Sequence, residues 1–332
     1  MKMHGKQGRF LCVIATMMAM QGHERPLEAA EKELTEEELD FGVRLQVYLD
    51  RATFAPGKID GRTGAVTMRA LQNLITARGW NNGLGETFVG EFTGLDPLYV
   101  TYEIKQDDRK WIGSVPSSRS AQSRRSRLPY TSLAEFVAER FHTSEVLLKE
   151  LNPDVNIYGL KPGDQLRVPN VVPFEIEKLS PHIENQPPHP PMLMLQNRVM
   201  VSLDDNTARV YDADDRLLAS FPITSGSSMR GMRTPRGKWK VANVVVYPNF
   251  RYDRSMLKTG KRSKNYVMLP PGPNNPVGVA WMGLNRSGIG LHGTNNPRTI
   301  SRAVSHGCMR LSNWDAVRLM QYVQPETPVT IE

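Results

Sequence analysis

The chain has 332 residues, of which 39% are hydrophobic and 24 are proline, and its formal net charge is +8. This composition excludes a disordered polypeptide and indicates a folded, loop-rich protein with room for two or three domains. The excess of Lys and Arg favours an anionic partner such as nucleic acid, a membrane surface or an acidic polymer. Nucleic acid is the weakest of these, because the basic residues occur without the interleaved aromatic residues expected of such a protein.

Residues 1–22 are predicted to form an export signal or an uncleaved N-terminal anchor. Lys2, Lys6 and Arg9 precede an apolar run from Phe10 to Met20, which has the length of a signal-peptide core and is short for a membrane span. A buried N-terminal helix is the alternative. Export would place the protein in the periplasm or cell envelope. If the segment is removed, one cysteine remains and no internal disulfide can form.

Residues 23–97 are predicted to form a small helical module. Thr35 and Glu38 have capping-box spacing, and apolar residues follow at helical intervals. A second helix is expected from about residue 63 to 78, after a turn that contains Pro56 and Gly57. The run from Pro56 to Gln72 resembles the loop and helix of helical peptidoglycan-binding modules. An ordinary helical hairpin with a Gly-rich turn is the alternative.

Residues 98–172 are predicted to form a module of strands and helices. Residues 100–104 alternate as a short strand, and the Ser- and Arg-rich residues 114–127 are expected to be a solvated, flexible loop. The succession from Phe136 through Leu147 to residues 160–170 resembles a lysin motif, a β-α-α-β fold that binds glycan containing N-acetylglucosamine. The basic insertion separates the first strand from its helix, and a purely structural spacer is the alternative.

Residues 173–198 are predicted to be a proline-rich linker, stiffened between residues 180 and 191. His182 and His189 fall in it without companion ligands, and we expect them to be exposed and uninvolved. No spacing of His, Cys and Asp in the sequence indicates a metal site.

Residues 199–332 are dominated by short alternating runs joined by Asp and Asn turns, which predict an antiparallel sandwich or barrel. The expected strands lie near residues 199–203, 208–211, 217–223, 239–245 and 277–284. One helix is expected at residues 313–323, because Ala316, Leu319, Met320 and Val323 share a face. The basic residues 255–264 are predicted to form a flap, with the proline-rich residues 270–276 as a rigid rim.

The chemistry is predicted to lie in residues 292–310, which contain His292-Gly293-Thr294 and Ser305-His306-Gly307-Cys308-Met309-Arg310. A cysteine becomes a strong nucleophile when an imidazole or backbone N–H groups favour the thiolate. His292 and His306 are both candidate bases, and sequence alone does not separate them. Gly307 allows a sharp turn that could point N–H groups at an oxyanion. An inert, buried cysteine is the alternative.

This run resembles the L,D-transpeptidase catalytic domain, whose pattern is a His-Gly pair, a spacer, and Ser/Thr-His-Gly-Cys followed closely by Arg or Asn. The resemblance implies a multidomain protein with a mainly-β catalytic domain, a β-sandwich with one packed helix, preceded by small α and α+β modules. It makes Cys308 the nucleophile and His292 the base. The other site residues it implies are His306 lining the site, Gly307 at the oxyanion, Arg310 at a substrate carboxylate, and Gly293, Thr294 and Ser305 shaping the turn.

The implied reaction needs no cofactor. The thiol attacks a tetrapeptide stem of peptidoglycan, releases D-alanine and passes the acyl group to an amine of a neighbouring stem, and carbapenem-type β-lactams should acylate it. The sequence leaves open whether the acceptor is a stem amine, water or a lipoprotein lysine. It also leaves open an L,D-carboxypeptidase or thiol hydrolase, and a non-catalytic peptidoglycan-binding protein.

Overall fold

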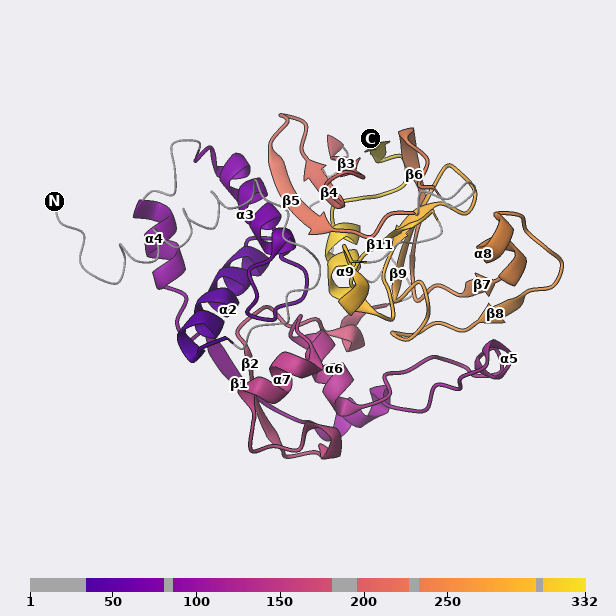
Figure 1. Cartoon of the computed structure of the whole chain (residues 1–332). Helices are drawn as coiled ribbons and strands as arrows, with labels where there is room; N and C mark the ends of the chain where they lie inside the picture. Colours follow the sequence, from indigo (N-terminus) through magenta and orange to yellow (C-terminus); the bar gives the residue numbers. More distant parts are fainter. Residues whose placement is uncertain (1–33, 81–85, 181–195, 227–232, 303–306) are drawn as a thin grey trace.

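The computed structural model of the chain describes residues 34–80, 86–180, 196–226, 233–302 and 307–332 (Figure 1). The predicted export signal, His182 and His189 lie outside these residues, as does most of the predicted linker. Within the described ranges, no helix has both the length and the apolar character needed to cross a membrane.

The N-terminal part is helical. Its elements are α2 (Glu36–Arg51), α3 (Ala65–Arg78) and α4 (Glu86–Thr93). The predicted capping box is confirmed, because the Glu38 N–H donates to Thr35 Oγ1 at 3.2 Å and the Thr35 N–H donates to the Glu38 carboxylate at 2.9 Å. The turn before α3 packs directly on α2, where a Cβ on Gly42 would lie 1.8 Å from the Gly61 oxygen. Glycine is therefore required at this crossing.

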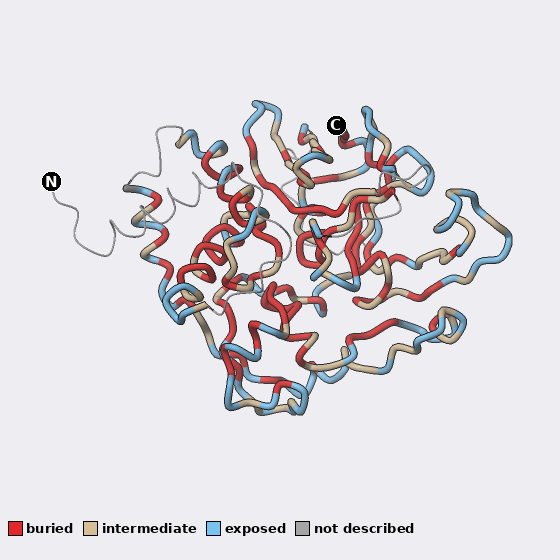
Figure 2. The backbone as a smooth tube through the Cα atoms, in the orientation of Figure 1, coloured by how far each residue is buried: buried red, intermediate tan, exposed pale blue. Residues whose placement is uncertain are grey.

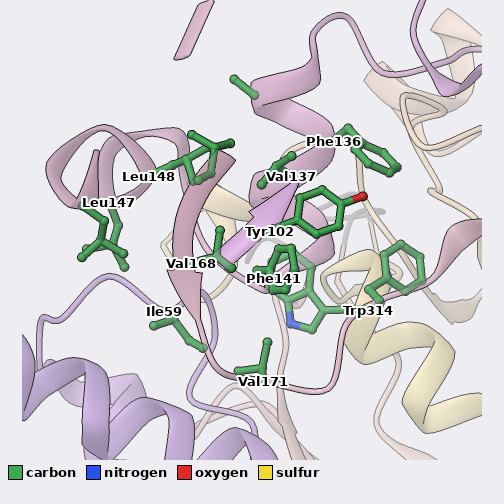
Figure 3. Packing of buried hydrophobic residues seen from close by; sticks show 14 of the residues in the cluster. Ile59, Tyr102, Phe136, Val137, Phe141, Leu147, Leu148, Val168, Val171 and Trp314 are labelled. Carbon is green, nitrogen blue, oxygen red and sulfur yellow. The ribbon is translucent and has the colours of Figure 1, made fainter. Parts of the chain in front are cut away.

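A second unit follows, in which β1 (Tyr99–Glu103) pairs antiparallel with β2 (Gln165–Pro169). The helices α6 (Leu133–Arg140) and α7 (Glu145–Leu151) lie between them in the chain, and short 3-10 helices occur at η2 (Gln106–Trp111), η3 (Ile157–Gly159) and η4 (Ile176–Lys178). Figure 3 shows the apolar cluster of this unit, which also takes in Ile59 from the helical part and Trp314 from the C-terminal part. The three segments therefore share core contacts, and Figure 2 shows buried stretches of backbone in each of them.

The prediction of a solvated loop at residues 114–127 holds for most of its side chains, which are exposed or half-buried, but it misses a short helix. This segment contains the short helix α5 (Arg119–Gln122), which Ser118 caps by accepting from the Ala121 N–H. Gln122 is buried and donates to the Pro116 oxygen at 2.7 Å, and the Arg119 guanidinium lies 5.3 Å from the Tyr252 ring centroid. Composition alone indicated a solvated segment because it does not show that these side chains have partners elsewhere in the chain.

The C-terminal part is built on one eight-stranded sheet. Its strands are β3 (Arg198–Ser202), β4 (Thr207–Tyr211), β5 (Leu217–Pro222), β6 (Gly237–Val246), β9 (Ala280–Leu284), β10 (Gly290–His292), β11 (Met309–Arg310) and β12 (Pro328–Ile331), in the spatial order β11-β10-β9-β6-β12-β3-β4-β5. The two ends of this order meet, because Thr224 beyond β5 exchanges backbone hydrogen bonds of 2.9 and 3.0 Å with Arg310 of β11.

The mainly-β prediction is therefore confirmed, but the two stacked sheets of a sandwich are replaced by a single curled sheet. Alternation of apolar residues predicts where strands occur and which of their faces is buried. It does not predict which strands become neighbours in the sheet. The helix α9 (Asn313–Met320) packs on β9 and β10, as the prediction of one packed helix required.

The predicted flap falls on a separate hairpin. The strands β7 (Phe250–Tyr252) and β8 (Val267–Leu269) pair antiparallel, and α8 (Arg254–Thr259) lies between them. Asp253 is buried and caps α8 through bonds from the Ser255 and Met256 N–H groups. The hairpin reaches the sheet at Arg262, which donates to Ser287 Oγ at 3.3 Å.

One buried carboxylate joins the three parts of the chain. Asp50 of α2 is fully buried and accepts two bonds from Arg318 of α9, at 2.7 and 2.8 Å, while His142 after α6 lies 3.0 Å away through Nδ1. Burial alone would raise the pKa of Asp50, but His142 and Arg318 outweigh it and hold that pKa well below its usual range. Burial lowers the pKa of His142, and its Nδ1 donates to Asp50 because a carboxylate can only accept.

Replacing Asp50 with Ala is expected to lower the free energy of unfolding by about 3–5 kcal/mol, because the Arg318 charge would stay buried without its partner. Denaturant unfolding of the full chain measures this. Asp214→Ala is the matched control, since its pair with Arg216 is exposed at 74% and 71%, and it should cost less than about 1 kcal/mol. Equal, small losses in both variants would contradict a central role for Asp50.

Candidate functional site

The predicted catalytic residues His292 and Cys308 lie at the parallel pair β10 and β11, His292 in β10 and Cys308 just before β11. The register aligns Leu291 with Met309 and His292 with Arg310. Leu291 and Met309 are buried in the sheet's apolar cluster, so the alternation of side chains places His292, Arg310 and the preceding Cys308 on the opposite face. The fold thus brings the thiol and the imidazole from distant sequence positions to neighbouring strands.

The Cys308 thiol has a backbone acceptor. It is half-buried, and its Sγ–H donates to the Gly288 oxygen at 3.2 Å. Burial raises the pKa of the Cys308 thiol to about 11, although the Gly290 backbone N–H acts in the opposite direction. Desolvation thus favours the neutral thiol over the thiolate in the free protein.

His292 is held in one orientation by its own loop. It is 4% exposed, its Nδ1 lies 2.6 Å from the Gly293 oxygen, and its ring stacks on Trp281 at 5.5 Å between centroids. A carbonyl can only accept, so Nδ1 carries the proton and Nε2 is the acceptor. Burial, together with the charge of Arg310, lowers the pKa of His292 to about 4, although the bond to the Gly293 oxygen opposes the shift. The imidazole is therefore neutral and available as a base.

Of the other predicted site residues, the structure describes Thr294, Gly307 and Gly293 but not Ser305 and His306. Thr294 is buried and its Oγ1 accepts from the Asn296 N–H at 3.2 Å, and Gly307 has φ +111°, which a residue with a Cβ adopts only with strain. Gly293 donates its N–H to the Ala280 oxygen at 3.0 Å. Ser305 and His306 lie outside the described residues, so the structure does not compare His306 with His292 as base.

Asn313 is a site residue that sequence reasoning missed. This buried amide begins α9, and its Oδ1 accepts from the Val279 N–H at 3.1 Å. A Cβ on Gly293 would lie 2.2 Å from the same oxygen, and one on Gly278 would lie 2.0 Å away. In the sequence, Asn313 follows Ser312 at the start of a predicted helix, where a polar residue is ordinary. No neighbouring residue in the sequence indicates that Asn313 packs against the turn at His292 and Gly293.

A cleft of about 370 Å³ lies beside the loop that follows His292. Residues 295–298 line it together with α6, α7 and Lys58 of the helical part. Its charged side chains have partners in the protein, as in the 2.8 Å pair of Arg298 with Glu145. The cleft therefore marks where the catalytic loop borders the N-terminal segments. Among the described residues, no group of three or more His, Cys, Asp or Glu side chains is arranged to hold a metal ion.

Comparison with known families assigns the C-terminal part. Residues 196–331 match the family model of the L,D-transpeptidase catalytic domain, YkuD. The prediction of such a domain is confirmed for this part of the chain, whereas the resemblances of the two N-terminal modules stay predictions.

Similar proteins carry the same family name. A protein of Bacillus licheniformis, provisionally named L,D-transpeptidase YkuD, is 29% identical over 59% of this chain and 92% of its own length. The probable L,D-transpeptidase ErfK/SrfK of Escherichia coli is 26% identical over 72% of this chain and 70% of its own. L,D-transpeptidase 3 from Mycobacterium tuberculosis, solved with a faropenem-derived adduct, is 15% identical with a TM-score of 0.33, over 52% of this chain and 75% of that one.

The raised pKa of the Cys308 thiol predicts that Cys308 reacts slowly with alkylating agents at neutral pH. The thiol pKa of about 11 means that the thiolate fraction, and with it the rate of alkylation by iodoacetamide, should rise about tenfold per pH unit between pH 7 and 10. Peptide mapping separates Cys308 from Cys12. A rate that levels off near pH 6 or 7 would instead indicate a preformed thiolate–imidazolium pair.

Proposed function

We propose that this protein is a peptidoglycan L,D-transpeptidase in which Cys308 is the nucleophile and His292 the general base. The observation that carries the proposal is the fixed imidazole: Nδ1 bonds to the Gly293 oxygen, and Nε2 is left as acceptor on the face that Cys308 shares. The match of residues 196–331 to the L,D-transpeptidase catalytic domain supports the same reaction.

In the first half-reaction, the Cys308 thiol gives its proton to His292 Nε2 as the sulfur attacks the carbonyl of the L-centre of the stem's diamino acid. A C–S bond forms and an oxyanion develops, which backbone N–H groups near Gly307 and Cys308 would stabilise. The tetrahedral intermediate then collapses, the C–N bond to D-alanine breaks, and the imidazolium returns the proton to the departing amine. The product is a thioester on Cys308.

In the second half-reaction, an amine of a neighbouring stem attacks the thioester and gives its proton to His292. The C–S bond breaks, the sulfur is reprotonated, and the new amide cross-links two stems. Arg310 is half-buried beside His292 in the sheet register, where its charge suits a stem carboxylate. We assign Gly293, Thr294, Ser305 and His306 to shaping and lining this site.

The N-terminal segments would hold the substrate polymer. We propose that the helical module and the lysin-motif-like module bind peptidoglycan, and that the protein is exported to the periplasm or cell envelope. The net charge of +8 is consistent with an acidic polymer as partner.

Incubating the full chain with a disaccharide-tetrapeptide should give three products by mass spectrometry: the acylated protein, free D-alanine and a cross-linked dimer. Cys308→Ala should abolish all three, and His292→Asn should slow acylation by roughly 10²- to 10⁴-fold, because general-base catalysis contributes that much. Arg216→Ala, at an exposed residue, is the control. D-alanine without dimer would indicate an L,D-carboxypeptidase, and binding without acylation would indicate a non-catalytic wall-binding protein.

A carbapenem such as imipenem should form one covalent adduct per chain, because the thiol that attacks the stem carbonyl can also open a β-lactam ring. Intact-protein mass spectrometry and peptide mapping would locate it on Cys308, and Cys308→Ala should remove it. An adduct that persists in Cys308→Ala would contradict the assignment of the nucleophile.

A further inference from the structure

We propose that Glu139 of α6, a residue outside the matched catalytic domain, is a positioning residue for His292 and acts through Asn313. The inference rests on the proposed function for its kinetic measurement, while its spectroscopic measurement does not depend on turnover. It makes the segment before the catalytic domain part of the active-site structure.

The first link is a hydrogen bond across the boundary between α6 and α9. Glu139 is 7% exposed, and its Oε1 accepts from Asn313 Nδ2 at 2.9 Å and from Tyr130 Oη at 2.8 Å. The orientation of the Asn313 amide is set by the donor on its other side, the Val279 N–H, which requires Oδ1 there. Nδ2 must then face Glu139, which is its shorter acceptor at 2.9 Å, while the Pro273 oxygen is a longer one at 3.4 Å.

The second link joins Asn313 to the catalytic turn. Its Oδ1 occupies the space that a side chain on Gly293 would need, because a Cβ there would be 2.2 Å away. The Gly293 oxygen is the acceptor that holds the proton of His292 on Nδ1 at 2.6 Å. A shift of Asn313 therefore moves the group that selects the tautomer of the base, and the effect requires no contact between Glu139 and His292.

The role that this geometry gives to Glu139 is that of an acceptor, not that of a charge. Burial raises the pKa of Glu139 to about 8, and the bonds from Asn313 and Tyr130 oppose the rise. A neutral carboxyl still accepts at Oε1, and so does the side-chain oxygen of glutamine. Glu139→Gln should therefore preserve the link. Glu139→Leu keeps a similar volume, removes the acceptor of the buried Tyr130 hydroxyl, and leaves Asn313 Nδ2 with only its longer bond of 3.4 Å to the Pro273 oxygen.

The test compares these two variants in the full chain. Glu139→Leu should slow acylation by a carbapenem on the order of 10- to 100-fold, because small displacements of catalytic groups have effects of that size. Glu139→Gln should acylate at close to the original rate. ¹⁵N NMR of the histidine rings, with the signal assigned by His292→Asn, should show a single Nδ1–H tautomer in the original protein and in Glu139→Gln, and a tautomer mixture in Glu139→Leu.

Glu135→Ala is the matched control. Glu135 lies one turn earlier on α6 and accepts from Asn274 of the C-terminal part at 2.8 Å, so its loss removes a contact between the same two parts without touching Asn313. It should change neither the acylation rate nor the His292 tautomer. Should Glu139→Leu fail to fold, Asn313→Ala, which removes the linking amide itself, makes the same comparison.

The proposal is overturned if Glu139→Leu and Glu135→Ala slow acylation equally, or if the His292 tautomer in Glu139→Leu matches that of the original protein. If neither the stem peptide nor a carbapenem acylates the protein, the proposed function is contradicted. The tautomer comparison would still decide whether Glu139 positions His292.

Discussion

The Asp50 carboxylate, fully buried between His142 and Arg318, is the constraint on which the arrangement of the chain depends. A buried carboxylate is unfavourable unless donors satisfy it, and here the donors come from two other parts of the chain. Asp50 belongs to the helical part, His142 follows α6, and Arg318 lies in the helix that covers the curled sheet. Moving any one part away would leave a charge in an apolar surrounding, so we infer that the three parts fold as one cooperative body.

The same helix, α9, connects this junction to the catalytic site. Arg318 near its end binds Asp50, the buried Trp314 stacks on His142 at 5.3 Å, and Asn313 at its start packs against the histidine turn. A helix held at two points by residues from outside the sheet cannot shift without affecting the strands β9 and β10 on which it packs. The N-terminal segments are therefore structural supports of the candidate site.

Part of the fold was predictable from sequence, because some of its features depend only on residues close together in the chain. The capping box at Thr35 and Glu38 and the alternation in β3 to β5 each depend on neighbouring residues, and the structure contains them. The remainder depends on partners far along the chain. Asp50 and Glu139 read as ordinary charges on helix surfaces, and only the packing of one part on another buries them. The strand order, the ordered α5 segment and the Asn313 contacts were missed for the same reason.

Burial also decides how the thiol and the imidazole can react. It raises the pKa of Cys308 to about 11 and lowers that of His292 to about 4, which favours the neutral form of both groups. Under the proposed mechanism, proton transfer from the thiol to the imidazole therefore requires a new charge that compensates for the desolvation, and the developing oxyanion of a bound acyl substrate would supply it. The nucleophile would then be generated once substrate is bound, and before that the protonated thiol would be a poor target for oxidants.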